Sequence, residues 1–352
     1  IIKRFLGTFF FALSLIIMIA VVCDLTERMD DFIERKAPVK AIVFEYYLNF
    51  IPYFANLFSS LFIFISVIFF TSKLTANSEI IAIMSSGVSF KRLMIPYLIS
   101  ALVLALLSFF LSNFIIPQAN IRRLEFEETY IRNPYRNFDI NIHKKIAPDV
   151  FIYMESYNAR SKIGYKFSME TFENKELKSK LVSDFIRWDT IVHKWKINNY
   201  YIRHFVDSTK EIIEKGRETD TVLSILPEDF ERRESVVETM DYSDLNAFID
   251  EQVAQGADNI ETFLIEKYRR IAFPFSTFIL TIIGLTLSIR KSKGGTWLHI
   301  GIGLLLSFSY IMFMQISTQF AINGGASPAF AVWVPNIIFS VIAAILYFLA
   351  PK

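Results

Sequence analysis

The sequence predicts a polytopic α-helical membrane protein with six transmembrane helices and an inserted β domain. Of the 352 residues, 53% are hydrophobic, and these residues are concentrated in long runs. A bilayer core about 30 Å thick requires about 20 apolar residues in a helix. Six of the runs reach that length. The polar stretch between the third and fourth runs changes to the two-residue period of β-strands.

The six predicted spans contain no Asp, Glu, Lys or Arg. They are residues 5–22, 50–71, 93–116, 271–289, 297–320 and 329–350. A buried helix of a soluble core explains one such segment, but it does not explain six of them. Proton-coupled transporters usually carry ionisable groups within the membrane, so the charge-free spans disfavour a proton relay.

Basic residues in the short connections set the predicted orientation. They are Lys3, Arg4, Lys73, Lys91, Arg92, Arg290, Lys291, Lys293 and Lys352. All of them fall on one side of a six-span chain, so the positive-inside rule predicts that this side, with both termini, is cytoplasmic. The connection 24–49 lies on the opposite side and breaks the rule, because it carries four basic residues.

The insert between spans three and four is predicted to be a β domain on the outer face. Short runs that mix apolar and polar residues favour a β-sandwich or barrel. These runs are residues 151–155, 165–169, 181–185 and 195–201. Residues 243–255 return to helical spacing. The predicted domains are therefore residues 1–116 with spans one to three, 117–268 with the β domain, and 269–352 with spans four to six.

Motifs for several kinds of chemistry are missing from the sequence. It has no GxxxxGK[ST] phosphate loop, no HExxH metal motif and no GxSxG nucleophile turn. A single cysteine, Cys23, excludes an internal disulfide and a cysteine-based metal site. The net charge of +2 with no basic tract gives no reason to expect nucleic acid as a partner. We predict no catalytic residue and no metal ligand.

Residues 77–93, NSEIIAIMSSGVSFKRL, predict a short amphipathic helix between spans two and three. Helical spacing places Ile80, Ile83 and Met84 on one face, Ser78 or Asn77 can cap the start, and Gly87 can end it. Such a helix either lies on the inner leaflet or docks onto a cytoplasmic partner. Glu79 favours the partner, because a carboxylate is poorly placed against an anionic leaflet.

Several motifs resemble the LptF/LptG (YjgP/YjgQ) permease family, the membrane subunits of the lipopolysaccharide export ATP-binding-cassette transporter. The matching stretches are residues 77–88 (NSEIIAIMSSGV), 116–119 (IPQA), 268–274 (YRRIAFP) and the short connection 290–295. The resemblance covers essentially the whole chain in the same order. Residues 22–27 (VCDLTE) are closer to the LptG-like branch.

The resemblance implies a permease subunit that extracts lipopolysaccharide from the bacterial inner membrane and passes it to a periplasmic relay protein. A second, homologous permease would complete a heterodimer whose spans one and five form lateral gates. A cytoplasmic ABC ATPase dimer would use ATP and Mg, whereas this chain would bind no cofactor. The β domain would be periplasmic and of the jellyroll type. Residues 78–88 would be the coupling helix, with Ser78, Glu79, Ile80, Ile83, Met84 and Gly87 at the ATPase contact.

Basic residues at the outer ends of the spans are candidates for binding the phosphates of lipopolysaccharide. They are Arg28, Arg35, Lys36, Lys40, Arg122, Arg123, Arg269 and Arg270. Arginine forms bidentate charge-assisted bonds to phosphate, and lysine makes a point-charge contact. Acidic residues are interleaved with them, so a self-paired charged rim is the alternative interpretation.

Two other functions stay open at this level. A membrane-anchored sensor or scaffold would bind a ligand with its outer β domain and signal through residues 78–87. A secondary transporter is disfavoured by the charge-free spans. A transport subunit needs an ATPase and a second permease, whereas neither alternative does, so the partners of the chain discriminate among the three.

Overall fold

The computed structural model describes residues 1–131, 140–207, 210–231, 234–256, 260–289 and 295–350. The chain divides into two compact units. The membrane unit comprises Ile1–Ile131, Val237–Leu245 and Glu261–Lys352, and the sheet unit comprises Arg132–Val236 and Asn246–Ile260. Each unit is described separately below. The basic residues Arg290, Lys291, Lys293 and Lys352 lie outside the described residues.

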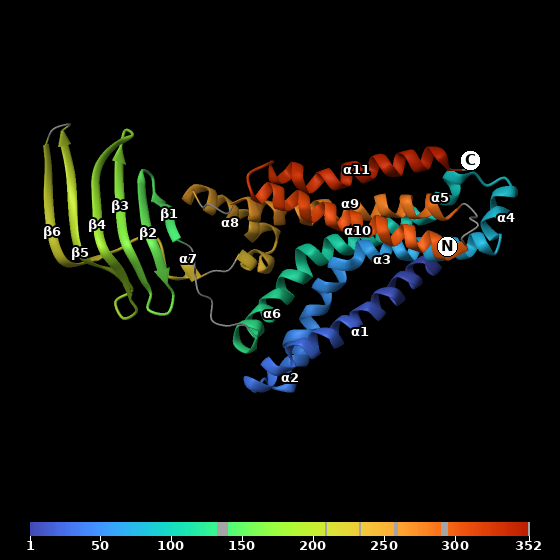
Figure 1. The fold of residues 1–352 in the computed structure, drawn as a ribbon, viewed down its shortest axis with the longest axis horizontal. Coiled ribbons are helices and arrows are strands. Elements are labelled where there is room, and N and C mark those ends of the chain that lie inside the picture. Colours follow the sequence, from blue (N-terminus) through green and yellow to red (C-terminus); the bar gives the residue numbers. More distant parts are fainter. Residues whose placement is uncertain (132–139, 208–209, 232–233, 257–259, 290–294, 351–352) are drawn as a thin grey trace. The chain divides into compact units, whose positions relative to one another are not determined.

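Six long helical segments form the membrane unit (Figure 1). They are α1 (Ile2–Glu34), α3 (Leu48–Ala76), α5 (Phe90–Phe110) continued by η2 (Leu111–Ile115) and α6 (Ile116–Tyr130), α9 (Ile260–Ser288), α10 (Gly295–Ile322) and α11 (Pro328–Leu349). Each predicted span falls on a different one of these segments, and each segment is long and apolar enough to cross a bilayer. The prediction of six membrane helices is confirmed.

The stretch 24–49, expected to be a loop, is mostly helical. Helix α1 continues to Glu34, and α2 (Val39–Ala41) and the π-helical η1 (Ile42–Tyr47) lead directly into α3. No Gly or Pro interrupts residues 24–34, and Asp24 and Arg28 form an ion pair of 2.8 Å one helical turn apart. The chain reverses only between α1 and α2, where Lys36 has a positive φ of 53° and Pro38 precedes α2.

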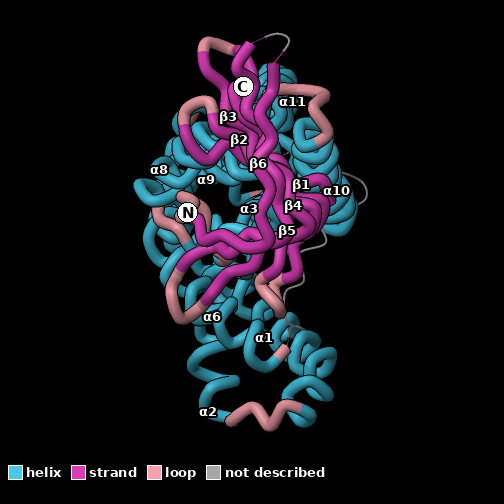
Figure 2. The backbone as a smooth tube through the Cα atoms, turned by 90° about the vertical axis from the view of Figure 1, so that its left-hand side faces the viewer, coloured by secondary structure: helices cyan, strands magenta, loops and turns pink. Residues whose placement is uncertain are grey.

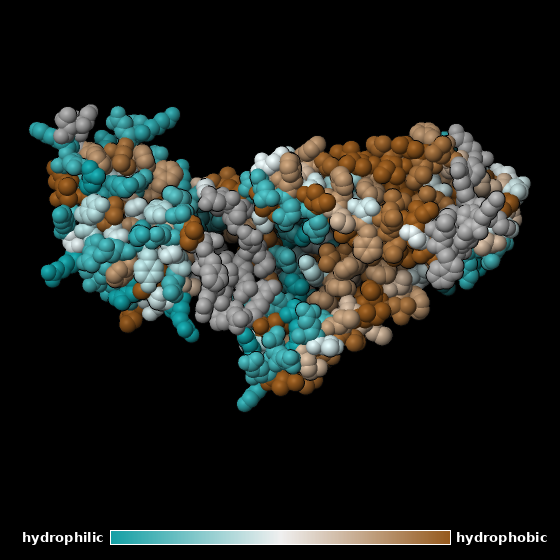
Figure 3. Space-filling view, viewed as in Figure 1, coloured by the Kyte–Doolittle hydropathy of each residue, from teal (hydrophilic) through white to brown (hydrophobic). Residues whose placement is uncertain are grey.

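Helix α3 is central to the membrane unit. Phe64, Val67 and Ile68 of α3 are fully buried. Side chains of α9, α10 and α11 surround Phe64 and Ile68, whereas Val67 belongs to a cluster with α1, α5 and α9. Gly303 of α10 lies so close to α3 that an added Cβ would overlap Ile68 Cδ1. On the face shown in Figure 3, the surface of the membrane unit is largely apolar (brown), as a lipid-facing surface requires.

The two ends of the membrane unit are named here by their short helices. The α4 end carries α4 (Glu79–Ser85), the N-terminus and the end of α11 (Figure 1). The α2 end carries α2, η1 and α6 together with residues 237–239 of the 3₁₀ helix η3 (Glu234–Thr239). Polar clusters occur at both ends.

The sheet unit contains one six-stranded antiparallel sheet in which neighbouring strands follow in sequence order (magenta in Figure 2). The strands are β1 (Ile140–Ala147), β2 (Val150–Asn158), β3 (Ile163–Glu173), β4 (Glu176–Asp189), β5 (Lys194–Asp207) and β6 (Lys210–Thr221). The four predicted runs fall on β2 to β5, which confirms a strand-rich insert within 117–268. Two further helices follow, α7 (Glu228–Glu231) and α8 (Tyr242–Gln255), and α8 matches the helix expected over 243–255.

The described strands form a single open sheet rather than the expected sandwich, jellyroll or closed barrel. One face is apolar, with Trp195 fully buried, and Phe230 and Ile225 from the segment after β6 pack onto that face. Trp195 Nε1 donates a hydrogen bond of 2.8 Å to the Ile225 carbonyl. The other face carries the Lys166–Glu155 ion pair together with Tyr165, Val182 and Tyr201.

Candidate functional site

Helix α4 turns its apolar face into its own membrane unit. Ile80 is 1% exposed, and Ile83 and Met84 pack against the apolar cluster of α1, α3 and α5. Ile81, by contrast, is 46% exposed. Three of the residues predicted to contact the ATPase are therefore wholly or partly covered by the chain's own helices. Ile80 is buried, and Ile83 and Met84 are only partly exposed. The open edge of α4 consists of Glu79, Ile81, Ala82, Ser85 and Ser86.

The start of α4 differs from the predicted side-chain cap. Ser78 precedes the helix with a left-handed φ of 62° and makes no capping hydrogen bond with its side chain. Asn77 instead donates a hydrogen bond of 3.2 Å to Glu79 Oε1, and Arg4 of α1 lies 3.8 Å from Glu79 Oε2. Gly87 follows the helix with a φ of 90°, the conformation that a glycine terminator supplies.

At the α2 end, Arg270 of α9 is a buried structural anchor. It is 4% exposed and uses three nitrogen atoms in separate hydrogen bonds. Nε donates to Glu266 Oε1 at 3.0 Å, Nη1 to the Met240 carbonyl at 2.7 Å, and Nη2 to the Val237 carbonyl at 2.8 Å. The guanidinium thereby ties the segment around η3 to α9.

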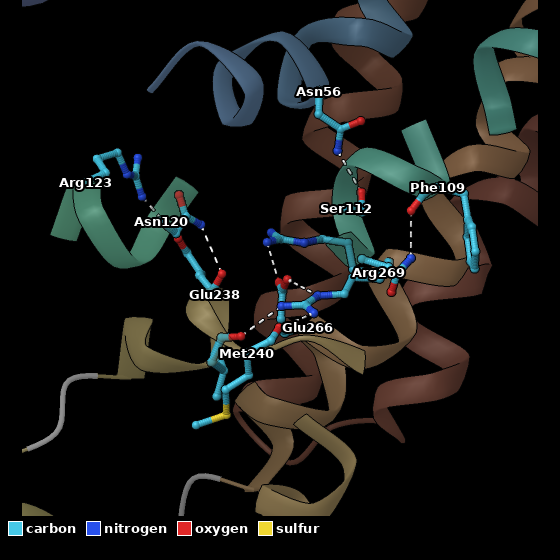
Figure 4. Close-up of polar contacts among 12 residues, drawn as sticks. Asn56, Phe109, Ser112, Asn120, Arg123, Glu238, Met240, Glu266 and Arg269 are labelled. Carbon is cyan, nitrogen blue, oxygen red and sulfur yellow. Dashed lines mark hydrogen bonds and ion pairs between the residues drawn. The ribbon is translucent and has the colours of Figure 1, made fainter. Parts of the chain in front are cut away.

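Arg123 of α6 anchors the same segment from the other side (Figure 4). It is 7% exposed, lies 3.3 Å from Glu238 Oε2, and stacks its guanidinium 4.5 Å from the centre of the Tyr53 ring. Asn120, one turn earlier, donates a hydrogen bond of 3.1 Å to the Glu238 carbonyl. Burial, and then the negative charge of Glu266, raise the pKa of Glu238 above its ordinary value.

These contacts correct the prediction that Arg123 and Arg270 bind substrate phosphate. Both side chains are buried and paired within the chain, so a phosphate could reach them only by displacing their partners. Arg269, the neighbour of Arg270, is also paired with Glu266, although 38% of its side chain is exposed. Successive helical residues point about 100° apart, which explains why the two adjacent arginines differ in burial.

A polar hydrogen-bond network connects α3 with span three beside this cluster. Asn56 Nδ2 donates to Ser112 Oγ at 2.9 Å, and Ser108 Oγ donates to Asn56 Oδ1 at 2.7 Å. Ser112 belongs to η2, whose π-helical turn widens the helix at this point. The side chains of Asn56, Ser112, Glu238, Glu266 and Arg269 share a pocket of about 70 Å³. Ligand sites usually offer about 300–1,000 Å³, so this cluster is a structural junction rather than a binding site.

The other predicted cations remain nearer the surface. Arg28 is held by Asp24, whose carboxylate also accepts hydrogen bonds from Tyr46 at 3.3 Å and Tyr47 at 3.2 Å. Arg35 Nη1 donates to the Thr129 carbonyl at 3.5 Å. Lys36, Lys40 and Arg122 are exposed. The surface that can meet an anion at the α2 end is therefore built from these three residues, together with the partly exposed Arg35 and Arg269.

One partner of the buried arginines was among the interleaved acidic residues: Glu127, one helical turn after Arg123 and 3.7 Å from it. Glu266 and Glu238 were missed from sequence. Glu266 lies three and four residues before Arg269 and Arg270, and this helical spacing is a signal that could have identified the pair. Glu238 lies 115 residues from Arg123 along the chain, so no local pattern predicts that contact. Among the described residues, no group of three or more His, Cys, Asp and Glu side chains could hold a metal ion.

The family of the chain follows from a comparison with known families. Residues 1–348 match the family described as lipopolysaccharide export system permease LptF/LptG. No curated protein matches the chain. The family match spans the six membrane helices and the inserted sheet together. The chain therefore belongs to the LptF/LptG family of lipopolysaccharide export permeases and is a multi-pass protein of the inner membrane.

Proposed function

We propose that this chain is the non-catalytic permease subunit of a lipopolysaccharide exporter that a separate cytoplasmic ATPase drives. The family match over residues 1–348 carries the proposal. The chain extracts lipopolysaccharide from the inner membrane and transfers it, through the sheet unit, to a periplasmic relay protein. It binds no cofactor itself, and the partner ATPase uses ATP and Mg.

The proposed orientation places the α4 end in the cytoplasm and the sheet unit in the periplasm. Among the described residues, the α4 end carries Lys3, Arg4, Lys73, Lys91 and Arg92, all of them exposed. Cytoplasmic loops of membrane proteins are enriched in Lys and Arg, which supports this orientation. The connection between α10 and α11, at the opposite end, has no Lys or Arg.

The open edge of α4 is the proposed contact for the ATPase dimer. Its surface combines the carboxylate of Glu79 with exposed Ile81 and small residues on either side. This composition suits a protein groove with a basic residue at one end, because a carboxylate and an apolar side chain can both be satisfied there. Motion of the ATPase would reach spans two and three directly, because α4 connects them.

A second permease of the same family is the proposed partner within the membrane. In α1 and α10, only 17% and 22% of the most apolar stretch is buried within the chain, compared with 61% in the spans containing α3 and α9. These two helices therefore have the largest surface left for a neighbouring subunit, which agrees with lateral gates at spans one and five. Lipopolysaccharide phosphates would meet Lys36, Lys40, Arg122, Arg35 and Arg269 at the α2 end.

Co-purification of the full chain in mild detergent tests the proposal. Tagged wild type should recover an ATPase and a second six-span protein. Glu79→Lys should lower the recovered ATPase and its ATP hydrolysis at least about tenfold, because the reversal places a cation against a basic site. Glu27→Lys is the matched control, since Glu27 is an exposed carboxylate near the far end of α1.

Arg4→Gln separates the external contact from the internal pair. It removes the partner that lies 3.8 Å from Glu79 but leaves the carboxylate itself, so the ATPase should still be recovered. Equal losses in Glu79→Lys and Glu27→Lys would contradict the contact at α4. Purification of wild type without any nucleotide-hydrolysing partner, in several mild detergents, would contradict the exporter itself.

A further inference from the structure

A groove between α1 and α3 opens at the α4 end. It offers about 620 Å³, which is within the usual size range of ligand sites. Its lining changes character along the helices, from basic residues to aromatic ones. The lining residues used below are Lys3, Arg4, Gly7, Phe11, Phe69 and Lys73.

The positive charges in the basic part of the groove have few carboxylate partners within the chain. No ion pair joins Lys3 or Lys73 to a carboxylate among the described residues, and both side chains are exposed. Arg4 makes one ion pair, with Glu79, at the long distance of 3.8 Å. Three cations from two helices therefore line one groove, and the one carboxylate that lines it with them is Glu79, the distant partner of Arg4.

The apolar part of the groove lies next along the same helices. Phe11 is 67% exposed, and Phe69 of α3 is exposed as well. Gly7 lies between the basic and aromatic positions of α1, and a Cβ added there would meet no atom within 4 Å. The space beside Gly7 is thus open, and it continues from the cations towards the apolar length of the helices.

We propose that this groove binds an anionic phospholipid, with the headgroup phosphate at Lys3, Arg4 and Lys73 and an acyl chain along Gly7, Phe11 and Phe69. Basic pockets between transmembrane helices on the cytoplasmic side suit acidic headgroups. An acidic protein segment would also meet the cations, but it would leave the exposed aromatic part of the groove unfilled. A phospholipid matches both parts, because its anionic headgroup is joined directly to its acyl chains, just as the basic part of the groove continues into the aromatic part.

The site shares Arg4 with the coupling helix. A phosphate bound at Arg4 would compete with Glu79, so an occupied groove leaves Glu79 free for a partner. The lipid site itself does not depend on the exporter proposal, because its lining belongs to α1 and α3 within the membrane unit. The experiment below therefore measures lipid alone and needs no ATPase.

Native mass spectrometry of the full chain, with whatever co-purifies, tests the proposal. The protein is exchanged into detergent with equal amounts of phosphatidylglycerol and phosphatidylcholine. Wild type should retain phosphatidylglycerol preferentially, and Lys3→Gln/Lys73→Gln should lower the retained amount at least about tenfold. Lys91→Gln/Arg92→Gln is the matched control, because it removes two exposed charges from the same end but outside the groove.

A larger side chain at Gly7 tests whether an acyl chain occupies the apolar part of the groove. Gly7→Leu should reduce phosphatidylglycerol retention, whereas Gly301→Leu should not, although an added Cβ at Gly301 of α10 also meets nothing within 4 Å. Millimolar glycerol phosphate distinguishes a lipid from a free phosphate. A lipid site keeps its phosphatidylglycerol because the acyl chain adds contacts, whereas a free-phosphate site exchanges it.

Three results would overturn the proposal. Equal losses in the Lys3/Lys73 and Lys91/Arg92 variants would mean that only net charge matters. Unchanged retention in Gly7→Leu, or complete displacement by glycerol phosphate, would mean that no acyl chain occupies the groove. If an acidic protein co-purified with wild type through Lys3, Arg4 and Lys73 and no lipid were retained, the groove would belong to a protein partner.

Discussion

At the α2 end of the membrane unit, Arg123 and Arg270 are buried, and each meets a glutamate and η3. At the α4 end, basic residues of the described chain are exposed, and Arg4 has a single long ion pair. Both ends carry basic residues, yet Arg123 and Arg270 hold the fold together, whereas the exposed cations of the α4 end can meet a ligand. The difference lies in the partners that other segments supply.

The physical reason is desolvation. A guanidinium that leaves water must recover its hydrogen bonds and its counter-charge within the protein, and Arg270 does so with Glu266 and two backbone carbonyls. An exposed cation keeps its hydration and contributes little to stability. Burial therefore separates structural cations from those that remain for lipids, lipopolysaccharide or partner proteins.

The largest expected effect is the loss of stability when Arg270, the buried anchor of the α2 end, is replaced. Arg270→Met should lower the free energy of unfolding by about 3–5 kcal/mol, because Glu266 and two carbonyls lose their donor in a buried site. Arg122→Met should change it by no more than about 0.5 kcal/mol, since Arg122 is exposed. Titration with sodium dodecyl sulfate in mixed micelles measures both. Similar losses in the two variants would contradict the structural role of Arg270.

The next effect distinguishes the two faces of α4. Ile80→Ala should cost about 2–5 kcal/mol in the same titration, because its side chain is buried in the core of α1, α3 and α5. Ile81→Ala should cost no more than about 0.5 kcal/mol, since Ile81 is exposed. If Ile81→Ala proved the more destabilising of the two, the assignment of the inward and outward faces would be reversed.

The smallest effect is a change in pH dependence at the α2 end. The pKa of Glu238 is raised in the folded protein, so the folded state holds its proton more tightly than the unfolded state does. This group therefore adds stability below its ordinary pKa of 4.5, and the contribution is lost as the pH rises from 4.5 through the folded-state value.

Thermal unfolding across that pH range measures the contribution. The stability of wild type relative to Glu238→Gln should fall as the pH rises. Glu34→Gln, at the end of α1, is a control with an exposed carboxylate. A difference that grows with pH would mean that the Arg123 ion pair, rather than burial, determines the titration of Glu238.

Much of the fold was predictable because length and period are local properties. Charge-free apolar runs gave the six spans, and the change to a two-residue period gave the strands. The open sheet was not predictable, because whether one face receives a second layer depends on segments such as the one that places Phe230 over Trp195. The helical end of α1 was missed because charged residues suggested a loop, although Asp24 and Arg28 have helical spacing.

The candidate site was predictable only in part. Residues 77–88 contain a short helix with an inward apolar face, and the sequence shows both the helix and its apolar stripe. It does not show which way the stripe points, because the receiving surface comes from three other helices. Arg123 and Arg270 looked like ligands because Glu238 and the Val237 carbonyl lie far away along the chain, although Glu266 is only one helical turn from Arg270.

Site-specific photo-cross-linking from α4 in native membranes tests the central claim most directly. A photoreactive residue at position 81, on the open edge, should give a covalent adduct with a nucleotide-hydrolysing subunit, and the same residue at position 80 should not. Position 33, exposed near the far end of α1, controls for collisions at the membrane surface. An adduct at position 80, or equal adducts at positions 81 and 33, would contradict α4 as the ATPase contact.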